Sequence, residues 1–290
     1  MARSSRPPSL VTLARRLVRD ERLFARGDLV LCAISGGPDS TALLHGLALL
    51  RRELGHTLAA VGVNHGLRAE AERELSHAAL VAEKVGVPFE VCLASVAPGP
   101  NLQERARTAR HDALAAAAQR HGASVIALGH TADDRAETLL LRVLRGAGPR
   151  GLAVLPPRAP SPVGAGIDVV RPILLARRSD VLLHLERQQL AYTDDPSNRD
   201  RRFLRARVRH EVVPLLEQLS PGVVEHLCHL SDMLARPQED ELLASFGRAQ
   251  RRQLERAARL GRRYSTVRLS GGRDVTVDIF ENTSVLPDER

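Results

Sequence analysis

The sequence is poor in several residue types, and each shortage argues against a class of protein. It contains no tryptophan and only 2% aromatic residues, which disfavours a nucleic-acid binder that works mainly by stacking bases on rings. The three cysteines, Cys32, Cys92 and Cys228, form no CxxC pair. Structural zinc, an iron–sulfur centre and a disulfide scaffold are therefore not expected. We expect a reducing cytoplasm as the setting.

Long apolar runs are also missing, and we expect no secretory leader. No stretch approaches the length of a membrane span, and residues 1–9 lack the apolar segment of a signal peptide. We accordingly expect no membrane partner. The 290 residues, 43% of them apolar, are nevertheless enough to bury a core in one large domain and a smaller one.

Lysine is almost absent, and arginine supplies nearly all of the positive charge. Lys84 is the only lysine, although the formal net charge is +8 and the sequence pI about 10.6. Surplus positive charge favours a polyanionic partner, and arginine offers phosphate a planar fork of donors. A GC-rich genome would explain the same arginine bias without any function.

Short apolar segments alternate with longer helical patterns from Asp28 onward. Strands that are apolar nearly throughout are typical of a parallel sheet covered by helices on both faces. We therefore expect an α/β fold with a doubly wound, mostly parallel sheet. The expected strands are 28–34, 56–64, 88–94, 123–128 and 167–173, and the expected helices are 40–54, 69–85, 102–120, 132–144 and 178–189.

Two regions interrupt this alternation. Residues 146–166 are rich in proline, glycine and arginine and are expected to form a long surface loop, and residues 193–202 are polar and turn-rich. Further on, residues 265–280 alternate like a β-hairpin. We expect a catalytic domain over residues 1–220 and a small C-terminal helical subdomain with a terminal hairpin over residues 221–290.

The most informative segment lies between the first strand and the first helix of this pattern. Glycines let a backbone approach a ligand closely, and a proline suits the first helical turn. The free N–H groups and the dipole of a helix start form an anion site, at the sheet edge where doubly wound folds bind ligands. The segment lacks a Walker lysine and a GxGxxG pattern. Its residues are Ser35, Gly36, Gly37, Pro38, Asp39 and Ser40.

This hexapeptide, SGGPDS, resembles the SGGxDS signature of the N-type ATP pyrophosphatases, also called the PP-loop superfamily. Members cleave ATP between the α and β phosphates. The resemblance implies an adenine nucleotide alpha hydrolase-like fold for residues 1–220, with ATP and Mg²⁺ as cofactors. It also implies that residues 35–40 bind the phosphates of ATP and that Asp39 is a metal ligand. Without a lysine, backbone amides, Mg²⁺ and arginines from elsewhere must neutralise the phosphates.

A second motif, GHTADDRAET, follows the fourth expected strand. Thr131 and Asp134 have the spacing of a capping box, which by itself signals only an ordinary helix start. That explanation leaves out His130, Asp133 and Glu137, of which the two acids share a helix face one turn apart. Carboxylates beside a nucleotide repel one another unless a cation, such as Mg²⁺ or a substrate ammonium, lies among them.

Several segments together resemble the tRNA(Ile)-lysidine synthetases, also called synthases. The similarity runs in order from about residue 29 to residue 219, and Ala206 stands where the family usually has asparagine. The segments are residues 63–68 (VNHGLR), 103–111 (QERARTARH), 129–152 (beginning GHTADDRAET), 195–198 (DPSN) and 205–216 (RARVRHEVVPLL).

The family resemblance implies an ATP-dependent ligase that forms a carbon–nitrogen bond. The oxygen on carbon 2 of the wobble cytidine of isoleucine tRNA (CAU anticodon) would attack the α-phosphate and release pyrophosphate. The ε-amine of free L-lysine would then displace AMP and give lysidine. The resemblance also implies a tRNA contact by residues 221–290 and allows a homodimer.

The resemblance also assigns roles to individual residues. Asn64 and His65 would border the adenine or ribose, and Gly129 and His130 would also contact the nucleotide. The residues expected to act in catalysis are Asp39, Asp133, Asp134, Arg107 and Arg207, with Asp39 and Asp134 as metal ligands. Asp133 and Asp134 are alternative holders of Mg²⁺ or of the lysine amine, and the two arginines are expected to clamp phosphate or the target nucleotide.

A stripe of arginines leaves two interpretations open. Arg202, Arg205 and Arg209 follow one another at helical spacing, which suits either an RNA backbone or a plain solvated helix face.

Three other functions compete with lysidine formation. A cytidine thiolase would need sulfur-handling cysteines, and a GMP or NAD synthetase would be accompanied by a glutaminase domain. A non-catalytic RNA-binding protein could keep a vestigial nucleotide loop. ATP–pyrophosphate exchange with and without tRNA separates these alternatives.

Overall fold

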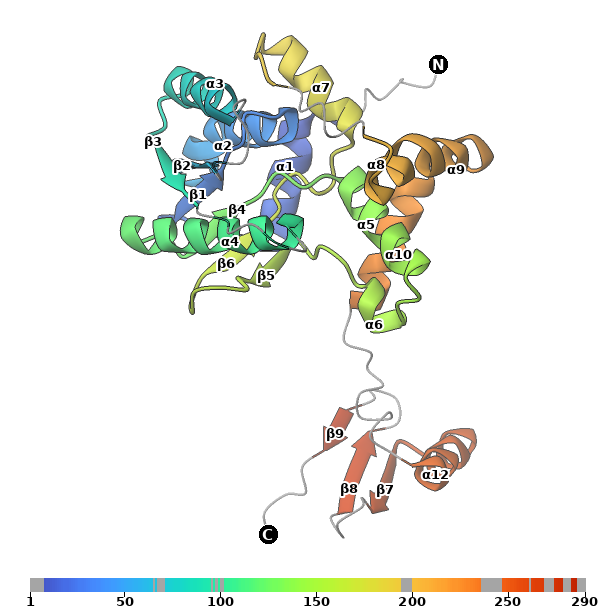
Figure 1. Cartoon of the computed structure of the whole chain (residues 1–290). Coiled ribbons are helices and arrows are strands. Elements are labelled where there is room, and N and C mark those ends of the chain that lie inside the picture. Colours follow the sequence, from blue (N-terminus) through green and yellow to red (C-terminus); the bar gives the residue numbers. More distant parts are fainter. Residues whose placement is uncertain are drawn as a thin grey trace, which may run out of the picture. The chain divides into compact units, whose positions relative to one another are not determined.

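The computed structural model describes residues 8–64, 66, 71–94, 96, 99, 102–193, 200–235, 247–260, 262–268, 274–278 and 283–285 (Figure 1). The chain divides into two compact units, Met1–Asp232 and Met233–Arg290. The boundary therefore lies after residue 232 rather than after the expected residue 220. The reason is α10 (Val223–Ala235), whose Val224 is buried in the first unit against Ala132 and Ala136.

A six-stranded sheet forms the centre of the first unit. Neighbouring strands run parallel except for β5, which pairs antiparallel with β6 at one edge. The α/β fold with a mostly parallel, doubly wound sheet is thus confirmed. In sheet order the strands are β3 (Phe89–Leu93), β2 (Thr57–Asn64), β1 (Leu29–Ala33), β4 (Val125–Ala127), β6 (Asp168–Val170) and β5 (Arg158–Pro160).

The expected loop over residues 146–166 is wrong in part. It contains the short helix α6 (Pro149–Leu152) and the edge strand β5. Arg158 begins β5 and binds Asp168 of β6 through Nε at 2.8 Å, which joins the two strands despite their short length. Pro160 is tolerated because an edge strand can spare an N–H group.

The helices of the first unit match the expected ranges closely where a β–α alternation predicts them. Helix α1, at the start of the chain, was not expected. Besides α6 and α10, the described helices of this unit are α1 (Leu10–Asp20), α2 (Pro38–Leu54), α3 (Ala71–Lys84), α4 (Leu102–His121), α5 (Ala132–Leu144), α7 (Arg178–Arg187), α8 (Leu204–Arg207) and α9 (Val213–Leu219). A π-helical turn at Val208–Val212 lies between the last two.

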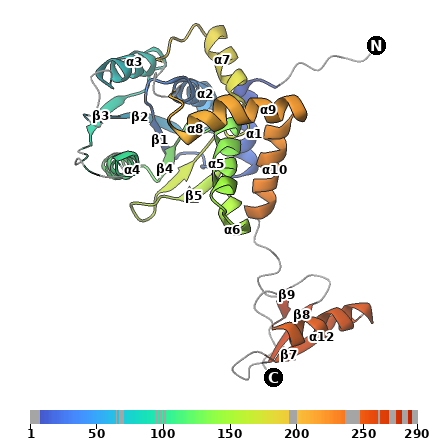
Figure 2. The same ribbon diagram turned by 45° about the vertical axis from the view of Figure 1, so that its right-hand side comes forward.

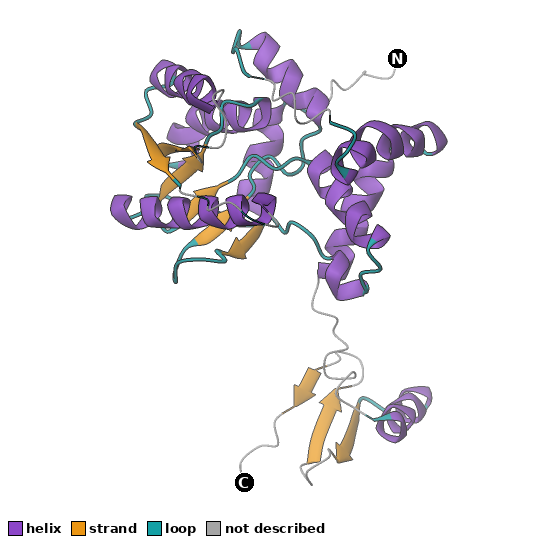
Figure 3. Ribbon diagram, viewed as in Figure 1, coloured by secondary structure: helices purple, strands orange, loops and turns teal. Residues whose placement is uncertain are grey.

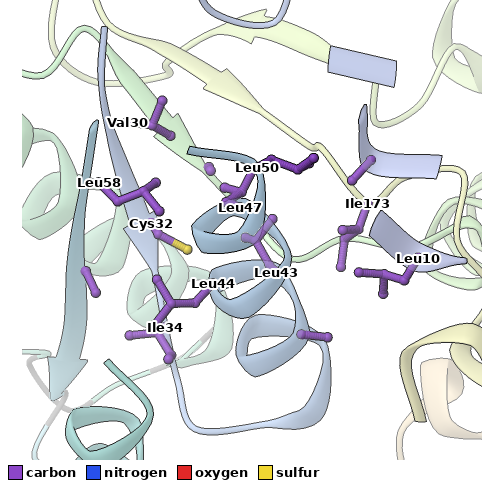
Figure 4. Close-up of a cluster of buried hydrophobic side chains, with 14 of the residues drawn as sticks. Leu10, Val30, Cys32, Ile34, Leu43, Leu44, Leu47, Leu50, Leu58 and Ile173 are labelled. Atoms are coloured by element: carbon purple, nitrogen blue, oxygen red, sulfur yellow. The ribbon is translucent and has the colours of Figure 1, made fainter. Parts of the chain in front are cut away.

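Side chains of β1 alternate between two cores, one on each face of the sheet. Val30 and Cys32 join the cluster formed with α1, α2, α3 and α7, in which leucines of α2 such as Leu47 face the strand (Figure 4). Leu31 joins the other cluster, where α4 contributes Leu114. Burial on both faces explains why the strand is apolar throughout.

Helices α5, α8, α9 and α10 gather beside the sheet (Figure 2). Arg177, at the start of α7, joins this group to the sheet domain. Its guanidinium binds Asp133 of α5 at 3.2 Å, Glu217 of α9 at 2.9 Å and Glu225 of α10 at 2.9 Å. Four helices are thereby tied at one point.

In the described residues from 247 onward, the second unit combines one helix with a small antiparallel sheet (Figure 3). The expected hairpin is confirmed by β7 (Tyr264–Arg268) and β8 (Asp274–Asp278), and β9 (Thr283–Val285) adds a third strand. Leu254 of α12 (Arg248–Arg259) is buried, as is Val267 of β7. Across the described ranges, no helix is long and apolar enough to cross a membrane.

Candidate nucleotide site

The strand order reverses direction between β1 and β4, because β2 and β3 follow on one side of β1 and β6 on the other. Such a reversal leaves a crevice at the carboxyl ends of the two strands, where doubly wound folds bind ligands. The segments that leave β1 and β4 border this crevice, and they are the two motifs of the sequence, residues 35–40 and 129–138.

The turn after β1 is held by a hydroxyl group of its own. Ser40 donates from Oγ to the carbonyl oxygen of Gly37 at 3.1 Å and accepts the backbone N–H of Ser35 at 3.2 Å. Helix α2 begins at Pro38 with Gly37 as its N-cap, a residue without a side chain to cap the helix. The N–H groups of the first turn therefore stay free for an anion.

Gly36 is the one position of this turn that requires glycine for its backbone angle. Its φ is +81°, in the left-handed region. A Cβ atom here would overlap the backbone carbonyl oxygen of Glu74 in α3 and would lie 3.2 Å from Oγ1 of Thr193. The carbonyl oxygen of Gly36 also accepts the N–H of Thr193 at 2.9 Å. The turn is thus fitted closely between its neighbours.

The loop after β4 packs on the start of α2. A Cβ atom on Gly129 would lie 3.0 Å from the backbone carbonyl oxygen of Asp39, so only glycine allows this approach. Thr131 and Asp134 form the expected capping box, in which Oδ2 of Asp134 accepts the N–H of Thr131 at 3.0 Å. The capping role uses Oδ2 and leaves Oδ1 of Asp134 for other partners.

A cavity of about 700 Å³ lies against both loops. All of residues 35–40 except Gly36 line it, as do Gly129, His130 and Asp134. Four arginines line it against three acids, which favours a polyanionic ligand. The acids are Asp39, Glu74 and Asp134, and the arginines are Arg110, Arg178, Arg205 and Arg209.

No lysine side chain takes part in this cavity. Lys84 ends α3 and donates to the carbonyl oxygen of Gln189 at 3.4 Å. It is not among the lining residues. The positive charge of the lining comes from guanidinium groups, as the near absence of lysine in the sequence requires.

Asp39 carries an unsatisfied oxygen in this cavity. Its Oδ1 is buried and has no hydrogen-bond partner among the described residues, while Oδ2 lies 3.7 Å from Nη1 of Arg178. Burial, and next the negative charge of Asp134, raise the pKa of Asp39 to about 6. A carboxylate in this state gains by meeting a cation.

Two arginines of the last helical segment bind the acids of α5. Arg205 donates from Nε to Glu137 at 3.1 Å and from Nη2 to Asp134 at 2.9 Å. Arg209 donates from Nε to Glu137 at 2.5 Å and from Nη2 to Asp134 at 3.1 Å. We call these four residues the arginine–carboxylate cluster.

Neither interpretation of the arginine stripe anticipated these ion pairs. Both side chains reach Asp134 and Glu137, whose buried negative charge needs a partner, although Arg205 stays exposed. Burial by itself raises the pKa of Asp134, but the charges of His130 and the two arginines bring it below its ordinary value. Arg202 instead binds its neighbour Asp200 at 2.6 Å.

A further positively charged group comes from α4. Arg110 of α4 lines the cavity, and its buried Nε has no hydrogen-bond partner in the described part of the chain. Burial, and next the charge of Arg107, lower the pKa of Arg110 and bring that of His111 to about 4. Burial also lowers the pKa of His130.

Comparison with known proteins identifies the family. The model of the PP-loop domain matches residues 11–216. A tRNA(Ile)-lysidine synthase from Thermobifida fusca is 39% identical over 249 residues, which are 85% of this chain and 74% of that protein. The chain belongs to the tRNA(Ile)-lysidine synthase family. A synthase of this family from Pseudomonas fluorescens is 40% identical over 207 residues, 71% of this chain.

The family includes longer proteins, and the chain spans about half the length of some of them. It covers 46% of the Pseudomonas relative. Among solved structures, the U34-tRNA thiolase NcsA from Methanococcus maripaludis matches with a TM-score of 0.66 at 18% identity, over 81% of this chain and 88% of that chain. This likeness shows a shared fold.

The residues to which the family resemblance assigns a role divide into those that line the cavity and those that do not. We call residues 35–40 the phosphate turn. Its Asp39 lines the cavity together with Gly129, His130 and Asp134. Asp133 does not, because its carboxylate accepts the backbone N–H of Arg178 at 2.7 Å and the side chain of Arg177. Asp133 thus anchors the start of α7 and orients Arg178.

The remaining expected residues lie outside the cavity lining. Asn64 ends β2 and accepts the N–H of Gly66 on Oδ1 at 2.8 Å. Arg107 is exposed on α4, and Arg207 is exposed and binds Glu211 at 3.3 Å. His65 lies outside the described residues, as do residues 195–198.

Four lining arginines were missed as site residues. Arg205 and Arg209 stand four apart and Asp134 and Glu137 three apart, a spacing that lets two helices pair charge with charge. Arg110 lies one turn after Arg107 on α4. The prediction therefore named the right helix, but the arginine that lines the cavity is Arg110. No pattern in the sequence points to Arg178, because its position depends on Asp133 of another helix.

Proposed function

We propose that this protein is an ATP-dependent tRNA(Ile)-lysidine synthase that adenylates the wobble cytidine of isoleucine tRNA and joins it to free L-lysine. The observation that carries the proposal is the cavity itself. A lysine-free phosphate turn lines one part of it, and Asp134, Arg205 and Arg209 of the arginine–carboxylate cluster line another.

The chemistry of the cavity suits an adenylation. The oxygen on carbon 2 of cytidine would bond to the α-phosphorus while the bond to the β-phosphate oxygen breaks and pyrophosphate leaves. The free N–H groups of α2 and the lining arginines are placed to hold phosphate oxygens and to stabilise their growing charge. The ε-amine of lysine would then bond to carbon 2, lose a proton and release AMP.

The residues at the cavity fit a magnesium ion. Oδ1 of Asp39 is a buried carboxylate oxygen without a hydrogen-bond partner among the described residues. In the same described ranges, no group of three or more metal-binding side chains occurs, which suits Mg²⁺ because that ion binds through one or two carboxylates and substrate phosphates. Asp39 would hold the ion, which would neutralise phosphate charge, because both oxygens of Asp134 already accept hydrogen bonds from Thr131, Arg205 and Arg209.

The acids of α5 are the proposed site for the lysine amine. Asp134 and Glu137 are 8% and 1% exposed, so their charges must be balanced by a cation in any state of the protein. Asp133 is a weaker candidate because Arg177 and Arg178 already occupy its oxygens.

A thiolase is the second function to consider, and the cysteines do not support it. Cys32 lies in the core, where burial raises the pKa of its thiol to about 12. All three cysteines are free and lie on different elements, β1, β3 and α10. Free thiols also suit the predicted reducing cytoplasm.

Recognition of the tRNA is proposed to involve the second unit. Its helix α12 has the sequence RAQRRQLERAAR, in which five of twelve residues are arginines. Such a helix suits contact with an RNA backbone. The homodimer stays a prediction.

Mass spectrometry of the product tests the proposed function. Isoleucine tRNA with a CAU anticodon is incubated with ATP, Mg²⁺, isotopically labelled lysine and the full chain. The wobble nucleotide is expected to gain the mass of labelled lysine less one water. A parallel ATP–pyrophosphate exchange assay is expected to need the tRNA. Exchange without tRNA would indicate a small-molecule substrate, and no turnover under any condition would refute the enzyme assignment.

A further inference from the structure

The arginine–carboxylate cluster places two kinds of ligand group in direct contact. Asp134 and Glu137 are the only acids it contains, and Arg205 and Arg209 each bind both of them. The side chains of Asp134, Arg205 and Arg209 also line the cavity that the phosphate turn borders. The arginines therefore contact buried carboxylates and also border the place proposed for a polyphosphate.

The two sides of the cluster differ in how far they can move. The side chain of Glu137 is 2% exposed and that of Asp134 is 11% exposed, and Asp134 is also fixed by its capping bonds. The side chain of Arg205 is 46% exposed and that of Arg209 is 19% exposed. An exchange of partners would thus move Arg205, the most exposed of the four side chains, and leave the acids in place.

The backbone beneath Arg209 is also unusual. Arg209 lies in the π-helical turn Val208–Val212, which follows α8 without a break. A π turn holds one more residue than an α turn and occurs often at functional sites. Arg205 belongs to α8, so the π turn begins three residues after it.

The buried acids restrict what can replace the arginines. A buried carboxylate that loses its cation is strongly destabilised, so the guanidinium groups can leave only if another cation arrives. An alkylammonium carries one positive charge and three donors, enough to bind both acids. At the same time, phosphate oxygens at the turn offer the arginines an alternative anion of higher charge.

We infer that Arg205 exchanges partners during the reaction, leaving Asp134 and Glu137 for the phosphates of ATP while the ε-ammonium of lysine takes its place and Arg209 stays bound to the acids. The inference rests on the proposed function for the identity of the two ligands. Its consequence is an order of binding. Lysine binds weakly to the free protein, whose acids are occupied, and tightly once a triphosphate has drawn Arg205 away.

Calorimetry on the full chain tests this coupling. Lysine is titrated into the protein alone and into protein saturated with Mg²⁺ and α,β-methylene ATP, which cannot be cleaved between the α and β phosphates. We expect lysine to bind at least about tenfold more tightly with the analogue, within the usual range of coupling between sites. Norleucine, which has the same chain length without the ε-amine, is expected to show no such gain.

Two variants separate the exchange from a general effect. In Arg205→Gln, the acids lose one of their cations, so lysine should bind more tightly to the free protein and the gain from the analogue should shrink toward onefold. Arg201→Gln is the matched control, because Arg201 is 74% exposed and lies 4.0 Å from Glu211, outside the cavity lining. Its coupling should equal that of the unchanged chain. Thermal unfolding of both variants verifies that they are folded.

The outcomes distinguish the exchange from the proposed function. Equal lysine affinity with and without the analogue, or weaker affinity with it, would overturn the exchange, while labelled lysine on the tRNA would still support the function. Retained coupling in Arg205→Gln would also overturn it. If the protein bound neither ligand and modified no tRNA, both proposals would fail together.

Discussion

Replacement of Gly36 by alanine is the sharpest single test of the phosphate turn, because the chain contains a matched control. Gly36 has φ +81° and Gly27 has φ +93°, so alanine at either position pays a similar backbone strain, about 1–2 kcal/mol of stability. The surroundings differ. Nothing lies within 4 Å of a Cβ at Gly27, whereas at Gly36 the Cβ overlaps the carbonyl oxygen of Glu74.

The overlap in Gly36→Ala must be relieved by moving the turn or α3. Overpacking of this kind adds about 1–3 kcal/mol to the destabilisation. A displaced turn also loses one or more hydrogen bonds to phosphate, each about 1.5–3 kcal/mol, which lowers ATP affinity by about ten- to a hundredfold. Gly27→Ala should leave ATP affinity unchanged.

Urea unfolding and calorimetry with Mg²⁺ and α,β-methylene ATP measure both effects. The reasoning would be refuted if the two variants lost equal stability and kept equal affinity for the nucleotide. A loss of affinity in Gly27→Ala alone would place the nucleotide elsewhere.

Three further predictions concern charge. Because burial and a neighbouring acid raise the pKa of Asp39 to about 6, Mg²⁺-dependent ATP affinity should fall about tenfold per pH unit below that value, and calorimetry on Asp39→Asn should show weak, pH-independent binding. His45 donates to or accepts from His184 at 3.0 Å, and burial lowers the pKa of His184 from 6.5 to about 4. As the pH falls, His184 therefore takes up its proton in the unfolded chain before it does so in the folded one. This histidine alone should lower the free energy of unfolding by about 2 kcal/mol between pH 7.5 and 5. Urea unfolding of the protein and of His184→Gln measures the effect, and an equal pH dependence in both would contradict it. Arg177→Gln should cost about 1–3 kcal/mol, more than the surface-pair variant Arg158→Gln at under about 1 kcal/mol, with ATP affinity kept in both; equal losses of stability would refute the role of Arg177.

The sequence predicted the sheet well because burial on both faces leaves a plain pattern. Strands such as β1 and β2 are apolar throughout, and each is followed by a helix with recognisable start signals, as Thr131 shows for α5. The short edge strand β5 escaped because three residues that include Arg158 and Pro160 carry no strand pattern. β5 forms only because it pairs with β6, and a pattern within residues 158–160 cannot reveal that pairing.

The site was predictable where backbone geometry is local and unpredictable where helices meet. Residues 35–40 form a turn whose glycines and serine act on one another, so the motif alone located it. Asp133 was expected in the cavity because it adjoins Asp134, yet adjacent helix residues point about 100° apart. Which of the two faces the cavity is decided by Arg177 and Arg178, and helix packing rather than spacing brings those residues close.

The all-arginine character of the cavity has a chemical consequence for selectivity among nucleophiles. A guanidinium stays protonated at physiological pH and does not attack an electrophilic carbon, whereas a lysine amine beside an activated base could do so. The sole lysine side chain of the sequence is tethered at the end of α3, outside the lining. An adenylated cytidine held here would therefore have no lysine side chain of the enzyme beside it. The enzyme would not react with its own intermediate before the free amino acid binds.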